Sequence, residues 1–428
     1  MKYLPIANQL FIENRKRLVA QLRPRSVAIF NANDIMPTNA DGTMLFRQNN
    51  DLFYFSGIDQ EETVLVIFPD APKEEWKEIL FLRETSEHIA IWEGHKLTKE
   101  QATETSGIKK IYWLSELDNI LPQLIFEAEH IYLNSNEHVR SSNEVETRDS
   151  RFIKSIKEKY PLHKLERLAP LMNDLRTIKH TIEIELIKKA IEITDNAFKR
   201  VLKFVKPGVA EYEIEAEITH EFIRNRATRH AYTPIIASGK DTCILHYNEN
   251  NKVCNNGDLL LLDFGAEYAN YAADLTRTIP VNGKFSERQT QVYNSVLRMQ
   301  TEAKKMLKKG TFLEEYGKEM GKVAEKELIG LGLLKKEEIE KQDPEKPLYK
   351  KYFMHGTSHF LGLDVHDVGS RFKPMQPGMV FTCEPGIYIK EEAIGIRLEN
   401  NILITDNGNI DLMESIPILS QDIELLMK

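Results

Sequence analysis

The sequence predicts two domains of different construction. The first is an α/β domain over residues 1–172, and the second is an α+β domain with an internal pseudo-twofold over residues 173–428. Three observations lead to this prediction: the length of 428 residues, an alternation of apolar runs and helix-compatible stretches in the first part, and a repeated arrangement of glycine, apolar run and acid in the second. A single core rarely grows beyond about 250–300 residues, so the length alone favours more than one domain.

The composition indicates a soluble globular protein and excludes several other classes. Hydrophobic residues make up 42% of the chain and charged residues 29%, which argues against a disordered, collagen-like or disulfide-stapled protein. The net charge of −8 is mild, so neither nucleic acid nor a membrane is expected as a partner. The three cysteines form no CxxC pair, and a cytoplasmic location fits this sparse set best. Residues 1–13 lack the apolar core of a signal peptide.

The first domain is expected to begin with a helix over residues 7–22, where apolar side chains recur at helical spacing. Short β-branched and aromatic runs after it predict strands. These runs are Val27–Phe30, Val64–Phe68, Ile111–Leu114 and Ile131–Leu133. Charged stretches between them, such as Lys73–Ile79, are predicted to be helical. The alternation is typical of a layered α/β domain.

The domain boundary is placed near residue 172. A charged stretch from Asn143 to Lys164 leads into a long helical pattern, Thr181–Val205, which Pro207 and Gly208 end. Proline and glycine are strong helix breakers, so the second domain is expected to open with one long helix.

The second domain contains two halves that resemble each other. Helix-like segments follow a Lys-Pro-Gly or Lys-Gly turn at Glu211–Arg224 and at Leu313–Leu328. Each half then has a glycine, an apolar run and an acid at the same offset, which are Gly257, Leu259–Leu262 and Asp263 in one half and Gly378, Met379–Phe381 and Glu384 in the other. A second acid follows each, Asp274 and Glu399. A duplicated α+β half would bring these acids together at a pseudo-twofold, whereas the alternative is chance likeness between amphipathic segments.

Two acids of the first half are predicted to lie on neighbouring strands. Asp263 closes an apolar strand, Gly265 marks a turn, and Asp274 lies on the next segment, so a hairpin would bring the two carboxylates together. A carboxylate at the end of so apolar a strand is costly unless it is paired or bound to a metal. For this pair alone, a metal site and a salt bridge to a base such as Arg277 remain equal alternatives.

A histidine cluster lies in the second half. Residues 355–366 contain three of the twelve histidines, His355, His359 and His366, and the glycines among them suit a tight loop. Three imidazoles this close favour a site, because imidazole is both a metal ligand and a proton carrier near neutral pH.

Further strands carry the remaining candidates. Side chains alternate along a strand, so Cys383 is expected to point away from Glu384 and is no co-ligand, while Arg397 and Glu399 share a face. Four converging acids need a cationic partner. Oxygen-rich ligation with one histidine suits manganese or cobalt better than a structural zinc. Five side chains are enough for two metals about 3.5–4 Å apart, which can make a hydroxide nucleophile for hydrolysis.

Short motifs follow one another in order across residues 175–428. They are Leu-His246-Tyr, Leu-Asp263-Phe-Gly, Asp274-Leu-Thr-Arg-Thr, His355-Gly-Thr-Ser-His359, Val-His366-Asp, Glu384-Pro-Gly and Arg397-Leu-Glu399. The N-terminal domain adds the run from Phe46 to Gly57 and the motif Ile91-Trp92-Glu-Gly. With these motifs nearly the whole chain resembles aminopeptidase P, the Xaa-Pro aminopeptidases of the creatinase/methionine aminopeptidase-like pita-bread metallopeptidase family.

The resemblance implies a pita-bread catalytic domain and a metal-dependent hydrolase that releases the N-terminal residue from peptides with proline in second position. It implies a homodimer or homotetramer and two divalent metal ions, Mn²⁺. It places the metal ligands on Asp263, Asp274, His359, Glu384 and Glu399.

The resemblance also assigns roles around the metals. His246 and His366 are assigned to the scissile carbonyl, and His355 to the wall that holds proline. Glu384 is the proton shuttle to the leaving nitrogen, and Arg397 orients neighbouring groups or Glu399. Trp92 aligns with an aromatic residue that the family brings from a neighbouring subunit, so it is a candidate substrate wall; an ordinary core tryptophan is the alternative.

Two departures from the family pattern bear on the choice of substrate rather than on catalysis. The stretch between Glu384 and Arg397 is short, and Asn400-Asn401 stand where the family often has an acid after the last ligand. Two other readings stay open. Prolidase uses the same ligands on Xaa-Pro dipeptides, and some relatives without metal serve as binding or scaffold proteins.

Overall fold

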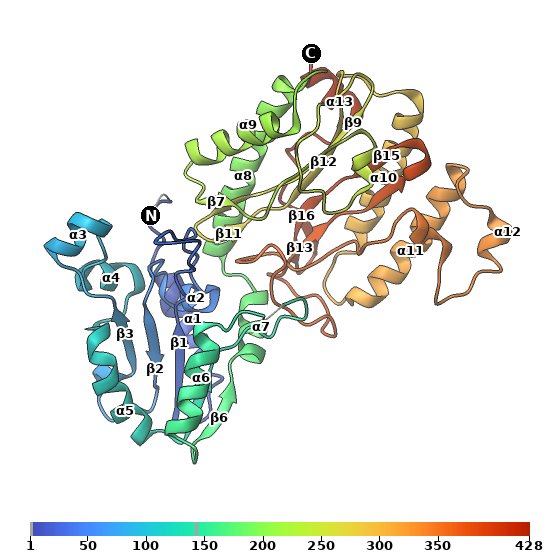
Figure 1. Ribbon diagram of the computed structural model, residues 1–428. Coiled ribbons are helices and arrows are strands. Elements are labelled where there is room, and N and C mark those ends of the chain that lie inside the picture. The colour runs from blue at the N-terminus through green and yellow to red at the C-terminus, as the bar shows by residue number, and fades with distance from the viewer. Residues whose placement is uncertain (1–2, 142–143) are drawn as a thin grey trace. The chain divides into compact units, whose positions relative to one another are not determined.

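The computed structural model describes residues 3–141 and 144–428, which divide into two compact units, residues 3–176 and 177–428 (Figure 1). The boundary expected at residue 172 lies within helix α7 (Ala169–Thr177), whereas the compact units divide after Arg176. Asn143, where the charged stretch before the boundary begins, lies outside the described residues.

Unit 1 is built on a six-stranded mixed sheet of order β4-β3-β2-β1-β5-β6 in its described part. The strands are β1 Ser26–Asn31, β2 Val64–Ile67, β3 Glu78–Leu82, β4 Lys110–Trp113, β5 His130–Leu133 and β6 Lys164–Arg167. The helices are α1 Gln9–Val19, α2 Asn50–Ser56, α3 Glu87–Glu93, α4 Lys99–Ser106, α5 Leu117–Glu127, α6 Arg148–Lys159 and α7. Short 3₁₀ turns are η1 Glu74–Trp76 and η2 Leu114–Glu116. The predicted α/β domain, its first helix and the four predicted strands are confirmed.

Each face of this sheet is covered by helices. Alternate strand residues such as Val27 and Ile29 pack with Leu124 of α5 and Ile156 of α6 in one apolar cluster. On the opposite face, the ring of Phe30 lies 4.9 Å from that of Phe55 in α2. Burial on both faces is what a continuous apolar run such as Val27–Phe30 in β1 requires.

The helix predicted over Lys73–Ile79 is wrong. Only the turn η1 forms there, and the chain then enters β3, which pairs antiparallel with β2 and parallel with β4. The charged residues before position 78 mimic a helix face, but Ile79 and Phe81 point into the apolar cluster between sheet and helices. Strand pairing and burial therefore override the local helical pattern.

Unit 2 repeats one arrangement twice, as the two similar halves of the sequence predict. The first half has helices α8 Thr181–Phe204 and α9 Glu211–Arg224, followed by strands β7 Arg229–His230, β8 Ile235–Ser238, β9 Leu259–Phe264, β10 Ala266–Tyr268, β11 Tyr271–Ala272 and β12 Leu275–Pro280, with the 3₁₀ turn η3 Gly239–Cys243 after β8. The second half has helices α10 Glu287–Met306, α11 Leu313–Gly330 and α12 Lys336–Ile339, the turn η4 Leu348–Lys351, strands β13 Val380–Cys383, β14 Gly386–Ile389, β15 Ile394–Arg397, β16 Asn400–Thr405 and β17 Gly408–Asp411, the turn η5 Lys390–Glu392 and the final helix α13 Ser420–Leu426. Each long helix pair precedes a three-stranded sheet, β12-β9-β8 in one half and β13-β16-β17 in the other.

The three helices predicted in this unit are confirmed as α8, α9 and α11, while α10 went unpredicted. Helix α8 begins where His180 caps its first turn, and it ends just before Pro207. Figure 1 shows α8 and α9 along one side of the strands of this unit and α10 and α11 on another. Within the described ranges, none of the helices combines the length and the apolar character needed to cross a bilayer.

One buried guanidinium makes several of the contacts between the two halves. Arg277 in β12 is 0% exposed, and its side chain donates to the carbonyl oxygens of Thr276 at 2.9 Å, Glu399 at 2.7 Å and Pro417 at 2.8 Å. It also donates to Oδ1 of Asn400 at 2.8 Å. A fork of fixed N–H donors can tie several backbones at once, which an ammonium group cannot do with the same geometry.

The junction between β9 and β10 allows no side chain at Gly265. A Cβ atom there would lie 1.8 Å from the carbonyl oxygen of Ala273. We expect Gly265→Ala to lower the free energy of unfolding of unit 2 by about 3 kcal/mol, because backbone must move to admit the methyl group. Denaturant unfolding followed by fluorescence measures this change.

Gly317→Ala is the matched control, since Gly317 is an exposed position within α11 and an added Cβ meets nothing within 4 Å. That change should instead raise stability by about 0.5–1 kcal/mol, because alanine is the better helix former. Equal unfolding midpoints for the two variants would show that the β9–β10 junction accommodates a side chain at Gly265 and would contradict this prediction.

Candidate metal centre

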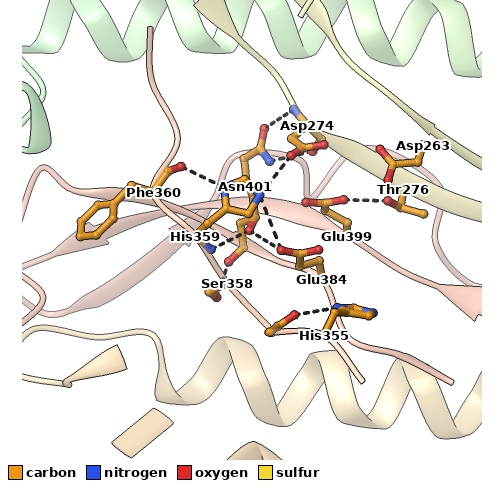
Figure 2. Close-up of polar contacts among 12 residues, drawn as sticks. Asp263, Asp274, Thr276, His355, Ser358, His359, Phe360, Glu384, Glu399 and Asn401 are labelled. Atoms are coloured by element: carbon orange, nitrogen blue, oxygen red, sulfur yellow. Dashed lines mark hydrogen bonds and ion pairs between the residues drawn. The ribbon is translucent and has the colours of Figure 1, made fainter. Parts of the chain in front are cut away.

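Four carboxylates and one imidazole meet where the strands of unit 2 end (Figure 2). Each acid lies at a strand terminus: Asp263 near the end of β9, Asp274 just before β12, Glu384 just after β13, and Glu399 between β15 and β16. The imidazole, His359, comes from the irregular segment before β13. The register of β9 and β12 places Asp263 opposite Thr276, so the expected neighbourhood of Asp263 and Asp274 is present.

Three of these side chains are close enough to share one ion. Asp274, His359 and Glu399 each offer a ligand atom, and these atoms lie within 4.8 Å of one another. Nε2 of His359 is 3.4 Å from Oδ2 of Asp274 and 3.6 Å from Oε1 of Glu384. Of the three clustered histidines, His359 is therefore the one that lies among the acids.

The ring of His359 presents the correct nitrogen to the acids. Its Nδ1 lies 2.9 Å from the carbonyl oxygen of Phe360, which can only accept, so Nδ1 carries the hydrogen and Nε2 faces the carboxylates. Burial lowers the pKa of His359, but the hydrogen bond to Asp274 and the charge of Glu384 outweigh it and raise the pKa to about 9. The acids therefore attract a positive charge to Nε2, and a metal ion binds through the same lone pair.

One phenol lies between two acids. Oη of Tyr232 is 2.5 Å from Oδ1 of Asp263 and 2.5 Å from Oδ1 of Asp274. A phenol has a single hydrogen, so it donates to only one of the two carboxylates at a time. Tyr232 was not singled out in the sequence, because nothing in its spacing distinguishes it from an ordinary tyrosine.

Glu399 is only half satisfied. Its Oε2 accepts a hydrogen bond from Oγ1 of Thr276 at 2.7 Å (Figure 2), whereas its buried Oε1 has no hydrogen-bond partner among residues 3–141 and 144–428. Burial raises the pKa of Glu399 well above its usual range, and the charges of Asp274 and Glu384 add to the effect. An orphaned carboxylate oxygen among like charges is the environment that a cation relieves.

Two more of the four acids, Glu384 and Asp274, behave in the same way. Burial raises the pKa of Glu384 to about 7, with the charge of His359 opposing and that of Asp274 adding. Burial, opposed by the hydrogen bond to His359, raises the pKa of Asp274 as well. The donor set of four carboxylates and one imidazole, with Cys383 turned toward the carbonyl of Gln300, therefore fits divalent ions that prefer oxygen ligands.

The alternative of a salt bridge to Arg277 is not realised, since that guanidinium is engaged by the carbonyls that join the two halves. The base that does reach the acids is Arg397, which donates to Asp263 and, through Nε, to Oγ1 of Thr276 at 3.2 Å. Thr276 also binds Glu399, so Arg397 at the end of β15 and Glu399 just after it both contact Thr276. One arginine does not balance four carboxylates.

His355 lies at the end of a hydrogen-bond chain. Nη1 of Arg397 donates to Oη of Tyr388 at 2.9 Å, and Oη of Tyr388 lies 2.8 Å from Nε2 of His355. The ring's Nδ1 is 2.7 Å from the carbonyl oxygen of Gly356. Burial and the charge of Arg397 lower the pKa of His355 to about 4, so the ring is neutral and Tyr388 donates to it. Tyr388 therefore links His355 to Arg397 and, through it, to the acid cluster.

The remaining predicted substrate residues lie outside the acid cluster. The ring of His366 is exposed and stands perpendicular to that of His359, with centroids 4.4 Å apart. His246 lies in an exposed turn, and its charge contributes to the lowered pKa of His355. Trp92 belongs to α3 in unit 1 and is 76% exposed, which excludes the alternative of a core tryptophan.

Asn401 fixes the backbone of one ligand. Its Nδ2 donates to the carbonyl oxygen of Asp274 at 2.7 Å, and its Oδ1 accepts from the N–H of Asp274 at 3.2 Å (Figure 2). Asn401 is 0% exposed. An aspartate could accept but could not donate, so the asparagine at this departure from the family pattern is matched to the pairing it makes.

Comparison with known proteins gives the same order of domains. Residues 185–406 match metallopeptidase family M24, and residues 11–132 match the N-terminal domain of aminopeptidase P. The chain is similar to the Xaa-Pro aminopeptidase of Escherichia coli strain K12, with 36% identity over 99% of this chain and 98% of that protein. It is also similar to human Xaa-Pro aminopeptidase 3, with 31% identity over 89% of this chain and 76% of the human protein.

Solved structures show the same likeness. A putative aminopeptidase P from Bacillus anthracis has a TM-score of 0.92 at 35% identity, covering 99% of this chain and 98% of that one. A variant of E. coli aminopeptidase P in complex with substrate has a TM-score of 0.88 at 34% identity, covering 99% of both chains.

We expect Asn401→Asp to weaken Mn²⁺ binding about tenfold, since supporting hydrogen bonds around metal ligands typically contribute that much. The variant loses the bond to the carbonyl of Asp274 and turns an acceptor toward that carbonyl oxygen, so the backbone of Asp274 is no longer held in place. Titration with Mn²⁺, followed by the electron paramagnetic resonance signal of free ion, measures the change. Asn282→Asp is the control, because Asn282 is exposed and its side chain bonds outside the acid cluster, donating to Oδ1 of Asn256 at 2.8 Å and accepting from the N–H of Lys284 at 3.2 Å; the same affinity in both variants would contradict the positioning role.

Proposed function

The chain belongs to metallopeptidase family M24 and is a metallo-aminopeptidase of the Xaa-Pro type, and we propose that it uses two Mn²⁺ ions held by five ligands. The ligands are Asp263, Asp274, His359, Glu384 and Glu399. The proposal depends on one observation: these side chains converge, with Oε1 of Glu399 lacking a hydrogen-bond partner among the described residues and Nε2 of His359 directed at the acids. The comparisons confirm the predicted resemblance to aminopeptidase P and the predicted fold class, an aminopeptidase P N-terminal domain followed by the M24 catalytic domain.

Manganese is proposed because of the ligand chemistry. Four carboxylates and a single imidazole form an oxygen-rich site without thiolate, which suits Mn²⁺ better than structural zinc. When bound, such a pair of ions lowers the pKa of a shared water and polarises a substrate carbonyl. All other steps fall to side chains of this chain.

Each reacting group of the substrate is assigned to particular side chains. The peptide places its carbonyl before proline toward His366 and His246, whose imidazole N–H groups stabilise the oxyanion that develops there. Glu384 takes the proton of the attacking water and delivers it to the departing proline nitrogen. His355, kept neutral and oriented by Tyr388, forms part of the wall against proline.

Arg397 is assigned the role of orienting its neighbours. It donates to Asp263, to Thr276 and to Tyr388, so one guanidinium holds a metal ligand and the partner of His355 at the same time. Because Thr276 carries the bond to Glu399, this arginine also acts on that ligand indirectly.

We further propose a homodimer or homotetramer in which Trp92 contacts substrate bound to a neighbouring subunit. Trp92 and its neighbour Ile91 are 76% and 78% exposed on the short helix α3, and large exposed apolar side chains in a pair are typical of contact surfaces. A cytoplasmic location is proposed because all three cysteines are buried and unpaired, which suits a reducing compartment.

A cleavage profile over peptides of graded length tests the substrate class. The protein loaded with Mn²⁺ should release Xaa from Xaa-Pro-Yaa and longer peptides, and should leave peptides with alanine in second position intact, because the proline wall excludes the more flexible backbone. Mass spectrometry of the products measures the outcome. Hydrolysis of Xaa-Pro dipeptides alone would instead identify a prolidase.

Metal analysis tests the dinuclear site directly. The purified protein should bind two Mn²⁺ per chain after loading, and a chelator should remove both activity and metal. Asp263→Ala should lower the metal content and reduce kcat/KM about a thousandfold, equivalent to about 4 kcal/mol. Asp406→Ala, which removes an exposed acid paired with Lys309, is the control and should change neither. Absence of stoichiometric metal in the loaded wild type would support the scaffold alternative.

A further inference from the structure

A buried carboxylate outside the candidate metal centre binds both ends of the segment that carries His246. Glu211 is the first residue of α9 and is 0% exposed. Its Oε1 accepts from the N–H of Ser238 at 2.8 Å and from Oγ of Ser238 at 2.7 Å. Its Oε2 accepts from Oη of Tyr247 at 2.8 Å and from the N–H of Lys252 at 3.0 Å.

The three residues that supply these donor groups lie at the beginning, in the middle and at the end of one segment. Ser238 ends β8, and Tyr247 directly follows His246. Lys252 lies where the chain comes back to the start of α9. The backbone of Glu211 adds a further bond, since its N–H donates to the carbonyl oxygen of Lys252 at 2.9 Å. One side chain therefore ties together Ser238, Tyr247 and Lys252.

The ammonium group of Lys252 pairs with Asp241, so the four bonds to the carboxylate come from two hydroxyl groups and two backbone N–H groups. A carboxylate is costly to bury, and four donors are needed to offset the loss of water. Simple loop closure could use a neutral residue at a lower desolvation cost. Glu211 instead places its carboxylate where it bonds to the residue after His246.

The ring of Tyr247 extends this support toward the site. It packs in an apolar cluster with Leu261 and Tyr388, among others. Leu261 lies on β9 two residues before Asp263, and Tyr388 bonds to His355. The side chain that Glu211 holds is therefore packed against elements that carry a metal ligand and the proline wall.

We propose that Glu211 is a positioning residue that acts through Tyr247 to fix His246 beside the scissile carbonyl. The proposal rests on the function proposed above. A substrate-binding imidazole in an exposed turn needs such support, since displacement of a catalytic group by about 1 Å can cost about a hundredfold in rate.

The test compares Glu211→Gln, Tyr247→Phe and a control on the same helix turn. Glutamine keeps the shape but presents an NH₂ group to donors, so kcat/KM for an Xaa-Pro-Yaa peptide should fall about 10–100-fold. Tyr247→Phe keeps the packed ring and loses only one bond, so its effect should be smaller. Glu213→Gln is the control, because Glu213 is exposed and its side chain accepts from the N–H of Ala210, a bond that glutamine can also make.

A double-mutant cycle separates positioning from general loosening of the fold. In a His246→Ala background, Glu211→Gln and Tyr247→Phe should lower kcat/KM by less than about twofold further, because the residue they position is gone. Mn²⁺ affinity should stay within about twofold of the wild type in each variant, since no metal ligand lies in this segment.

Some outcomes would overturn the proposal. Equal losses in the wild-type and His246→Ala backgrounds would assign Glu211 a purely structural role, as would unchanged kinetics in Glu211→Gln. Should Glu211→Gln fail to fold, Tyr247→Phe decides by the same cycle. A wild type that binds Mn²⁺ but cleaves no Xaa-Pro peptide would refute the proposed function itself, which the variants are not needed to show.

Discussion

Repulsion among four carboxylates is the constraint on which the rest of unit 2 depends. Burial raises the pKa of Asp274, Glu384 and Glu399, so the cluster is unfavourable unless cations balance it. Arg397 supplies one positive charge. The orientation of His359 turns the lone pair of Nε2 toward the acids, where it can bind a further cation. The fold therefore holds the acids in a geometry that they would not adopt by themselves.

The supports around this cluster come from outside the ligand set. Asn401 pairs with the backbone of Asp274, and Lys179 forms a fully buried ion pair of 3.1 Å with Asp367, the neighbour of His366. Breaking such a pair by removing one partner leaves an uncompensated charge in the interior. The four acids lie at the ends of strands, whereas His355, His359 and His366 lie on irregular segments that need separate anchors.

The sequence predicted those site residues whose neighbours along the chain form a recognisable pattern. Asp263 and Glu384 each close an apolar run, and the duplication of that pattern predicts their convergence. The sequence could not reveal Tyr232 or Thr276, because each contributes through a contact that only the folded chain creates. Spacing alone left open which of three histidines lies among the acids, and the family resemblance chose His359. The sequence also predicted a helix at the approach to β3, because strand pairing is decided by residues far away along the chain.

The guanidinium of Arg277 has a mechanical consequence for the metal centre. It binds the carbonyl of Glu399, a ligand from the second half, and the carbonyl of Thr276, two residues from Asp274 in the first. Because this planar group is rigid, a displacement of either half is transmitted to the other, and the two acids shift as a pair. The separation of Asp274 and Glu399 is thus tied to a side chain outside the proposed ligand set.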